Sequence, residues 1–204
     1  IMLGGPRAEE EVPKDNQISN NHVHAGGIEY YGATGIWLGF TQRSVISHNL
    51  VHDLPYSGIS VGWQWNPNPT PCKENLVEKN HVFDVMNRLC DGGCLYTLGF
   101  QPGTIIRGNH FHDVQRSQFA QGAPNNGMFI DEGSKGFLFE RNVIYNVPAA
   151  RMSAQFVRFN QCARDWHTWR DNHFGEEEQV KQSGKDIIAT AGPEPEYRAR
   201  FAQE

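Results

Sequence analysis

A short asparagine-centred pattern recurs along the chain at nearly constant intervals. Each copy has an apolar residue, two variable residues, Asn, one further residue, an apolar residue, and then His or an aromatic ring. The central residues of the copies are Asn21, Asn49, Asn80, Asn109, Asn142 and, in a looser copy, Asn172. They are spaced 28 to 33 residues apart. A repeat of this length indicates a solenoid, in which each unit packs only on its neighbours.

A second pattern lies between successive asparagines, and consists of Gly followed by three or four mostly apolar residues. It occupies residues 35–38, 58–61, 93–96 and 127–130. Runs this short, rich in β-branched and aromatic residues, are typical of strands. The fixed Asn suits a sharp corner, because it tolerates left-handed backbone and its amide can bond to the Asn of the next coil. The sequence therefore predicts an all-β chain, a right-handed parallel β-helix of about six coils.

The repeat divides the chain into two regions. Residues 1–175 are expected to form the β-helix domain. Residues 176–204 are expected to form a short helical cap over the last coil, with a capping-box-like start at 183–186 and a stop at Gly192. Residues 1–4 match the pattern of residues 36–39, so the chain is expected to begin inside a coil, as a fragment of a longer protein. The missing N-terminal coils of that protein would be its natural partner.

Composition excludes several classes of function. The chain has 18 basic and 23 acidic residues, a net charge of −5 and no basic run, so nucleic acid is not an expected partner. No segment has the ~20 apolar residues of a membrane span, and no membrane partner is expected. His24, His52 and His112 occupy the same repeat position as Phe83 and Tyr145, which indicates stacked rings. We therefore predict no metal and no cofactor.

Two aspartates stand apart from the repeat. Three other acidic residues recur at one repeat position and are expected in turns: Asp53, Asp84 and Asp113. Asp91 and Asp131, in contrast, align with Asn125 and Thr97, which are not acidic. Adjacent coils are only ~4.8 Å apart, so the two carboxylates could share a face if residues 92–93 fold Asp91 back. One could then stay protonated as a general acid while the other is ionised.

A purely structural alternative is that Asp91 caps a turn, while Asp131 or Glu132 binds backbone amides. Strand alternation instead predicts that Asp131 faces outward, with Met128 and Ile130 buried and Thr97 beside Asp131 on the next coil. The long loops 64–75 and 115–126 are expected to rise as walls on that side. The catalytic interpretation predicts carboxylate oxygens within ~10 Å of each other in an open cleft.

Other residues near the acidic segments are candidates for substrate binding. Trp and Tyr suit the stacking of sugar rings, because they combine an apolar face with a polar tip. The candidates are Trp37, Trp63, Trp65, Tyr96, Phe100, Gln101, Asn126, Glu132 and Arg158.

Two segments carry a family resemblance. Residues 91–109, DGGCLYTLGFQPGTIIRGN, and residues 127–134, GMFIDEGS, closely resemble the signature DGGGIYTLG…PGT.IRGN…DEGS of bacterial right-handed β-helix proteins. The nearest named group is glycoside hydrolase family 141, with members acting on α-L-fucose linkages and on xylan. The resemblance extends over residues 1–175. Cys94 stands where the signature often has a third Gly.

The resemblance implies a retaining glycosidase whose acid/base and nucleophile match Asp91 and Asp131, with a polysaccharide or oligosaccharide as substrate. Family members are much longer, which agrees with the expectation of a fragment. The substrates imply a periplasmic or secreted location, with any signal peptide upstream of Ile1.

The residues alone leave two alternatives open. One is a polysaccharide lyase, which needs a group that neutralises a uronate carboxylate and a base. Arg107 and Arg158 are candidates, although no compact basic cluster surrounds the acidic segments. The other is a non-catalytic glycan-binding solenoid, because a fold does not fix a function.

Overall fold

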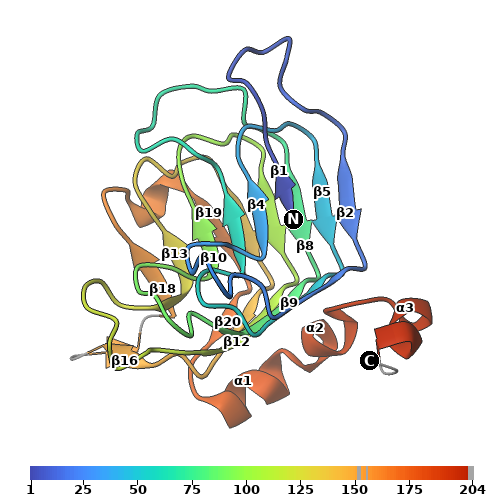
Figure 1. Cartoon of the computed structure of the whole chain (residues 1–204), viewed down its shortest axis with the longest axis vertical. Helices are drawn as coiled ribbons and strands as arrows, with labels where there is room; N and C mark the ends of the chain where they lie inside the picture. Colours follow the sequence, from blue (N-terminus) through green and yellow to red (C-terminus); the bar gives the residue numbers. More distant parts are fainter. Residues whose placement is uncertain (151–152, 155, 202–204) are drawn as a thin grey trace.

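The protein is a parallel β-helix. Its computed structural model describes residues 1–150, 153–154 and 156–201. In these ranges each coil contributes one strand to each of three parallel sheets, and every sheet has six strands (Figure 1). Strands pair with their copies in the preceding and following coils, as β10 does with β7 and β13. The predicted fold class is confirmed.

The three sheets are defined by the following strands. The first sheet carries the Gly-led segments and contains β1 (Met2–Leu3), β4 (Ile36–Leu38), β7 (Ile59–Val61), β10 (Gly93–Thr97), β13 (Asn126–Ile130) and β18 (Val157–Phe159). The second sheet contains β2 (Gln17–Ser19), β5 (Val45–Ser47), β8 (Leu76–Glu78), β11 (Ile105–Arg107), β14 (Leu138–Glu140) and β19 (Thr168–Arg170). The third sheet contains β3 (His22–Val23), β6 (Leu50–Val51), β9 (His81–Val85), β12 (His110–Val114), β15 (Val143–Ile144) and β20 (His173–Phe174).

The core lies in the space enclosed by the three sheets, because alternate residues of each strand point inward. Its fully buried members include Ile36, Ile59, Leu95, Met128, Ile46, Val77, Ile106, Val82 and Phe111. A short antiparallel pair, β16 (Ala149–Ala150) and β17 (Ser153–Ala154), and a one-turn 3-10 helix at Arg164–Trp166 interrupt the last coil.

The repeated asparagines form a ladder of side-chain amides. The Asn49 amide donates to the Asn80 carbonyl oxygen at 2.9 Å, Asn80 donates to Asn109 at 3.0 Å, and Asn109 donates to Asn142 at 2.9 Å. The expected stacking is therefore confirmed. The expectation of left-handed backbone at these residues is wrong, because the positive φ belongs to the residue before, as at Lys79 (φ 51°). That residue makes the bend, which leaves the Asn side chain inside the corner between its neighbours.

The third sheet carries stacked rings on its outer face. His52 stacks on Phe83 with ring centroids 4.8 Å apart, Phe83 on His112 at 5.1 Å, and His112 on Tyr145 at 5.0 Å. A second row lies beside them, in which His81 stacks on His110 at 4.5 Å. The predicted stacking of the histidines is confirmed.

Three short helices cover this face: α1 (Glu177–Ser183), α2 (Lys185–Thr190) and α3 (Pro195–Phe201). Figure 1 shows them in a row beneath β9 and β12, running back toward β2. Helix α1 packs on β15 and β20 near the last coil. Farther along, the Gly192 carbonyl lies 3.0 Å from Nδ1 of His48, and the Asn20 amide donates to Glu194. The helices thus extend from the last coil to the first, whereas the sequence predicted a cap on the last coil.

The start of the helical segment also differs from the prediction. The charged residues before 183 form α1, and Ser183 does not cap the next helix, because its hydroxyl donates to the Val180 carbonyl at 3.3 Å. The predicted stop at Gly192 agrees with the end of α2 at Thr190. Val180 and Ile187 bury their side chains with Val143 and Tyr145 of the outer sheet face. The cover extends beyond the last coil because its contacts continue along the outer face of the third sheet, where the Phe201 and His22 ring centroids are 5.1 Å apart.

The buried histidines make stability depend on pH. Burial lowers the pKa of His81 to about 3 and that of His110 to about 2, well below the ordinary value of 6.5. Below pH ~6.5 the unfolded chain therefore binds more protons than the folded one, so the free energy of unfolding falls as the pH drops toward 3. We expect a smaller loss in a protein with His81→Leu and His110→Val, the residues that neighbouring coils carry at this position. Urea unfolding between pH 7 and 4 measures this, and equal losses in both proteins would contradict it.

Candidate active site

Asp131 lies on the outer face of the first sheet, directly after β13. The residue is 5% exposed, and its carboxylate accepts two side-chain hydrogen bonds. The Tyr96 hydroxyl donates to Oδ2 at 2.5 Å, and the Asn160 amide donates to Oδ1 at 2.7 Å. The two donors come from the coils on either side and fix the orientation of the carboxylate. Side chains, and not the backbone amides that the structural alternative requires, thus hold it in the described structure.

The pairing of β10 with β13 corrects one detail of the prediction. Thr97 pairs with Ile130 and not with Asp131, and Gly93 pairs with Asn126. The alignment made from the sequence paired Gly93 with Gly127, the leading glycines of the two segments. The register is one residue different, because both the backbone N–H and the side-chain amide of Asn126 donate to the Gly92 carbonyl at 3.0 Å. Met128 and Ile130 still belong to the core, as expected.

Asp91 precedes β10, so it lies near the N-terminal ends of the strands of this sheet, whereas Asp131 lies at their C-terminal ends. The Asp91 backbone is left-handed, with φ 66°, and its carbonyl accepts a hydrogen bond of 3.0 Å from the Tyr56 hydroxyl. The Asp91 side chain is 57% exposed; its partial burial and the negative charge of Asp131 raise the pKa of Asp91, and the Arg158 guanidinium lowers it. Because the charge of Asp131 acts on Asp91, the two carboxylates belong to one electrostatic environment.

Arg158 joins this group from β18. Its strand places it in register with Phe129, and Phe129 in register with Tyr96. The guanidinium carbon lies 4.6 Å from the centre of the Phe129 ring. Its Nη1 lies 3.6 Å from Oδ1 of Asp91. A positive charge therefore sits beside the Asp91 carboxylate on the face that also carries Asp131.

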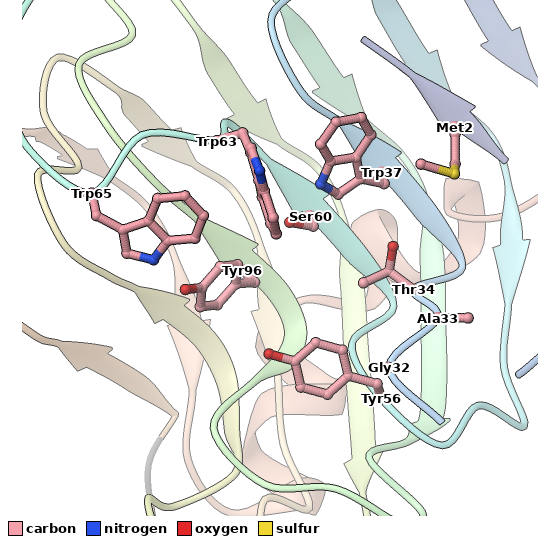
Figure 2. A pocket seen from close by; sticks show the side chains of 10 residues that line it. All are labelled: Met2, Gly32, Ala33, Thr34, Trp37, Tyr56, Ser60, Trp63, Trp65 and Tyr96. Atoms are coloured by element: carbon pink, nitrogen blue, oxygen red, sulfur yellow. The ribbon is translucent and has the colours of Figure 1, made fainter. Parts of the chain in front are cut away.

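An aromatic pocket of about 520 Å³ adjoins these residues on the side of the earlier coils (Figure 2). Trp37 and Trp63 meet edge to face with ring centroids 5.4 Å apart, and Trp63 and Trp65 do so at 4.7 Å. Figure 2 shows the Tyr56 and Tyr96 hydroxyls pointing to the same side. Trp63 and Trp65 are 41% and 46% exposed, so indole surface is available to a ligand. Tyr96 both lines the pocket and bonds to Asp131.

The two long loops lie at opposite ends of the strands of the first sheet, because one follows β7 and the other leads into β13. In the loop before β8, Asn66 lies against Gly133, close enough that an added Cβ at Gly133 would meet its backbone at 2.2 Å. In the loop before β13, the Gln121 carbonyl accepts a hydrogen bond from the Cys90 thiol at 2.8 Å. One loop therefore lies next to the Asp131 turn and the other next to Asp91.

The structure brings together some of the expected binding residues and places others elsewhere. Trp37, Trp63, Trp65 and Tyr96 line the pocket, and Arg158 lies beside Asp91. Gln101 is 1% exposed and donates to the Leu98 carbonyl, and Asn126 is fully buried. Phe100 lies under Lys135, and Glu132 accepts a hydrogen bond from Gln161. The geometry of Gln101 and Asn126 therefore supports a role in holding turns.

Two residues of the site were not found from the sequence. Tyr56 gave no signal, because it lies in a turn outside both repeated patterns. Asn160 follows β18, which pairs with β13, and so takes the position next to Asp131 in the following coil. That coil lacks the leading Gly of the second pattern, so the alignment could not extend to it.

One cluster has the composition of a metal site. Ligand atoms of His81, His110 and His112 lie within 4.8 Å of one another. Nε2 of His81 and Nε2 of His112 are 2.7 Å apart, whereas two nitrogens bound to one tetrahedral zinc lie about 3.3 Å apart. The rings of His81 and His110 are nearly parallel, at 9°, so their in-plane lone pairs do not converge. This geometry is that of a hydrogen-bonded ring stack.

The bond from Tyr96 to Asp131 gives a first test of the site. A Tyr96→Phe protein keeps the ring in the pocket but loses the hydroxyl donor. Under the catalytic interpretation of Asp131 drawn from the sequence, kcat should fall by roughly 10- to 100-fold with little change in KM, because the bond orients a reacting group. Tyr145→Phe, in the ring stack of the third sheet, is the matched control. Unchanged kcat in Tyr96→Phe would contradict this role.

Comparisons with known proteins identify the class. A family model described as the right handed beta helix region matches residues 4–144, and the chain belongs to this family. Together with the three parallel sheets, this confirms the predicted right-handed parallel β-helix.

Among solved structures, the chain is similar to one named "Glycoside hydrolase", with 26% identity and a TM-score of 0.77. The match covers 97% of this chain and 30% of that structure, so the chain spans less than a third of the other's length. No curated protein sequence matches the chain. None of the helices in the described ranges has the length and hydropathy of a membrane span.

Proposed function

We propose that the protein is a glycoside hydrolase of the right-handed β-helix family, with its reacting groups on the outer face of the first sheet. The observation that supports this most directly is the pair of carboxylates, Asp91 and Asp131, whose charges interact beside an open aromatic pocket. Glycosidases need one carboxyl group that donates a proton and one that is ionised. The similarity to a structure named as a glycoside hydrolase agrees with this proposal.

The two aspartates have different roles in this proposal. Asp91 is the acid, because burial and the Asp131 charge favour its protonated form. Asp131 attacks the anomeric carbon, while the Asp91 proton passes to the leaving oxygen and the glycosidic bond breaks. Water then attacks the same carbon, gives its proton to Asp91 and releases Asp131. Tyr96 and Asn160 hold Asp131 in place during both steps.

The aromatic pocket binds the sugar in this proposal. Trp63 and Trp65 are partly exposed, and the Thr34 side chain supplies a polar group at the wall. Aromatic walls with a few polar groups are suited to sugars, which have apolar ring faces and hydroxyl edges.

Elimination is less well supported by this pocket. A lyase needs a base near the uronate, and the ten residues that line the pocket include no Lys, Arg or His. Burial raises the pKa of Tyr56 to about 12 and raises that of Tyr96 further, which makes both phenols poor bases. Arg158 is the remaining candidate near the carboxylates.

The acid role of Asp91 predicts a defined pH dependence. Activity requires protonated Asp91, so it falls as the pH rises through the Asp91 pKa. Since the Arg158 guanidinium lowers this pKa, an Arg158→Gln protein should keep its activity to a higher pH than the parent. The pH profile of kcat/KM measures the shift of this alkaline limb. A limb that stays in place or moves to lower pH would contradict the assignment.

The function itself is tested by incubating the protein with a panel of plant and bacterial glycans and identifying the products by mass spectrometry. Hydrolysis gives saturated products with new reducing ends. Unsaturated uronides would support elimination instead, and binding without any product would support a glycan-binding solenoid.

A further inference from the structure

Arg158 is held in place without its hydrogen-bonding capacity being used. Its side chain is 23% exposed and its guanidinium lies over the Phe129 ring. Nη1 is buried and has no hydrogen-bond partner among the described residues. The nearest carboxylate oxygen, Oδ1 of Asp91, is 3.6 Å away, which is beyond the range of a normal hydrogen bond. A buried donor is therefore left open on the face that carries the carboxylates.

Other arginines of the chain make the contrast clear. Arg43 donates two hydrogen bonds of 2.8 Å to Asp15. Arg116 donates to the carbonyls of Ala120, Gly122 and Ala123 and so fixes its loop. Leaving a buried charged donor unpaired is costly and calls for an explanation, such as a functional role in which another group completes the bond. Arg158 thus has the character of a ligand-binding group.

The charge balance indicates what kind of ligand group would pair with the Arg158 guanidinium. In the working state Asp91 is protonated, so Arg158 then lacks its neighbouring negative charge. A guanidinium is best matched by a carboxylate, whose two oxygens fit its planar array of N–H donors. A ligand carboxylate would restore neutrality beside Asp91, which a sugar hydroxyl cannot do.

The position of Arg158 fits a glycan bound in the pocket. Arg158 is in register with Phe129 and Tyr96, so it lies two coils, roughly 10 Å, from the pocket wall formed by Tyr96. A chain of sugars held by Trp63 and Trp65 and extending over the carboxylates would reach it. We propose that Arg158 binds the carboxylate of a uronic acid residue, so that the protein acts on acidic glycans. This inference rests on the proposed function of the same site.

Binding can be measured without catalysis in an Asp131→Asn protein. The probes are a mixture of acidic oligosaccharides, obtained from pectin and glucuronoxylan, and the same mixture after chemical reduction of its carboxyl groups. We expect affinity for the acidic mixture to be at least ~10-fold higher, as one charge-assisted contact would give. Adding Arg158→Gln should remove the preference. Adding Arg164→Gln should not, although Arg164 stacks in the same way, 4.7 Å from the Trp169 ring.

Equal affinity for both mixtures, binding to neither, or a preference that survives Arg158→Gln would each overturn the proposal. Arg158→Met, which keeps the apolar stem over Phe129, serves as a second variant, and urea unfolding checks that both fold. If neither folds, the preference of the Asp131→Asn protein decides the question. Failure of the hydrolase proposal is seen separately, as absence of products from the parent protein while the acidic preference remains.

Discussion

An Asp131→Asn protein is expected to lose glycan hydrolysis by about 10³-fold or more, because the amide cannot attack the anomeric carbon. The Asn160 amide can donate to the new amide oxygen, and the Tyr96 hydroxyl can accept from the new amide group, so the fold should persist. The loss is measured as kcat/KM on the glycan that the parent cleaves. Wild-type activity in this variant would remove Asp131 from the mechanism.

Asp91→Asn should show a different pattern, because an acid matters only where the leaving group needs a proton. Hydrolysis of a natural glycan should fall by about 10² to 10⁴-fold, and that of an aryl glycoside with a good leaving group much less. Asp53→Asn is the matched control, since Asp53 is also exposed and left-handed, with φ 51°. It lies in a turn of an earlier coil, so its activity should equal that of the parent. Equal losses on both substrates would contradict the acid role of Asp91.

The largest effect on stability is expected from the asparagine ladder. Asn80 is fully buried; its amide donates to the Ile46 carbonyl, and its oxygen accepts from the backbone N–H of Asn49. Asn80→Ala leaves the buried N–H of Asn49 without an acceptor and removes the amide bonds to Asn49 and Asn109. The free energy of unfolding should fall by about 2–4 kcal/mol, as measured by urea unfolding.

The last rung of the ladder is the control for this change. Asn172 is half-buried and accepts hydrogen bonds from Asn142 alone, since no further rung follows in the described part of the chain. Asn172→Ala should cost about 1 kcal/mol, because water can reach the groups that it leaves unpaired. A cost for Asn80→Ala no larger than that for Asn172→Ala would show that the ladder does not carry the stability assigned to it.

The fold was predictable because the repeat is visible in the sequence. The Asn spacing and the Gly-led segments locate the corners and the first sheet, and the shared position of His52, Phe83 and His112 predicts their stacking. The path of the helices was not predictable, because it depends on apolar contacts with Tyr145 and Val143 of the outer sheet face, which are far away in the sequence. Local patterns do not contain such contacts.

The site was predictable only in part. Asp91 and Asp131 stand out because neighbouring coils have no acid at those positions. The one-residue error in register arose because Asn126, and not a Gly, pairs with Gly93. Tyr56 and Asn160 come from a turn and from an irregular coil, where no repeat marks them. Contacts between coils, which depend on register, decide what surrounds a carboxylate.

The central claim is that this face of the β-helix hydrolyses glycosidic bonds. The most direct test is to run the glycan incubation in heavy-oxygen water and analyse the products by mass spectrometry, for the parent and the Asp131→Asn protein. We expect saturated products from the parent that carry one heavy oxygen at the new reducing end, and none from the variant. Products without the heavy oxygen, unsaturated products, or equal yields from the two proteins would contradict the claim.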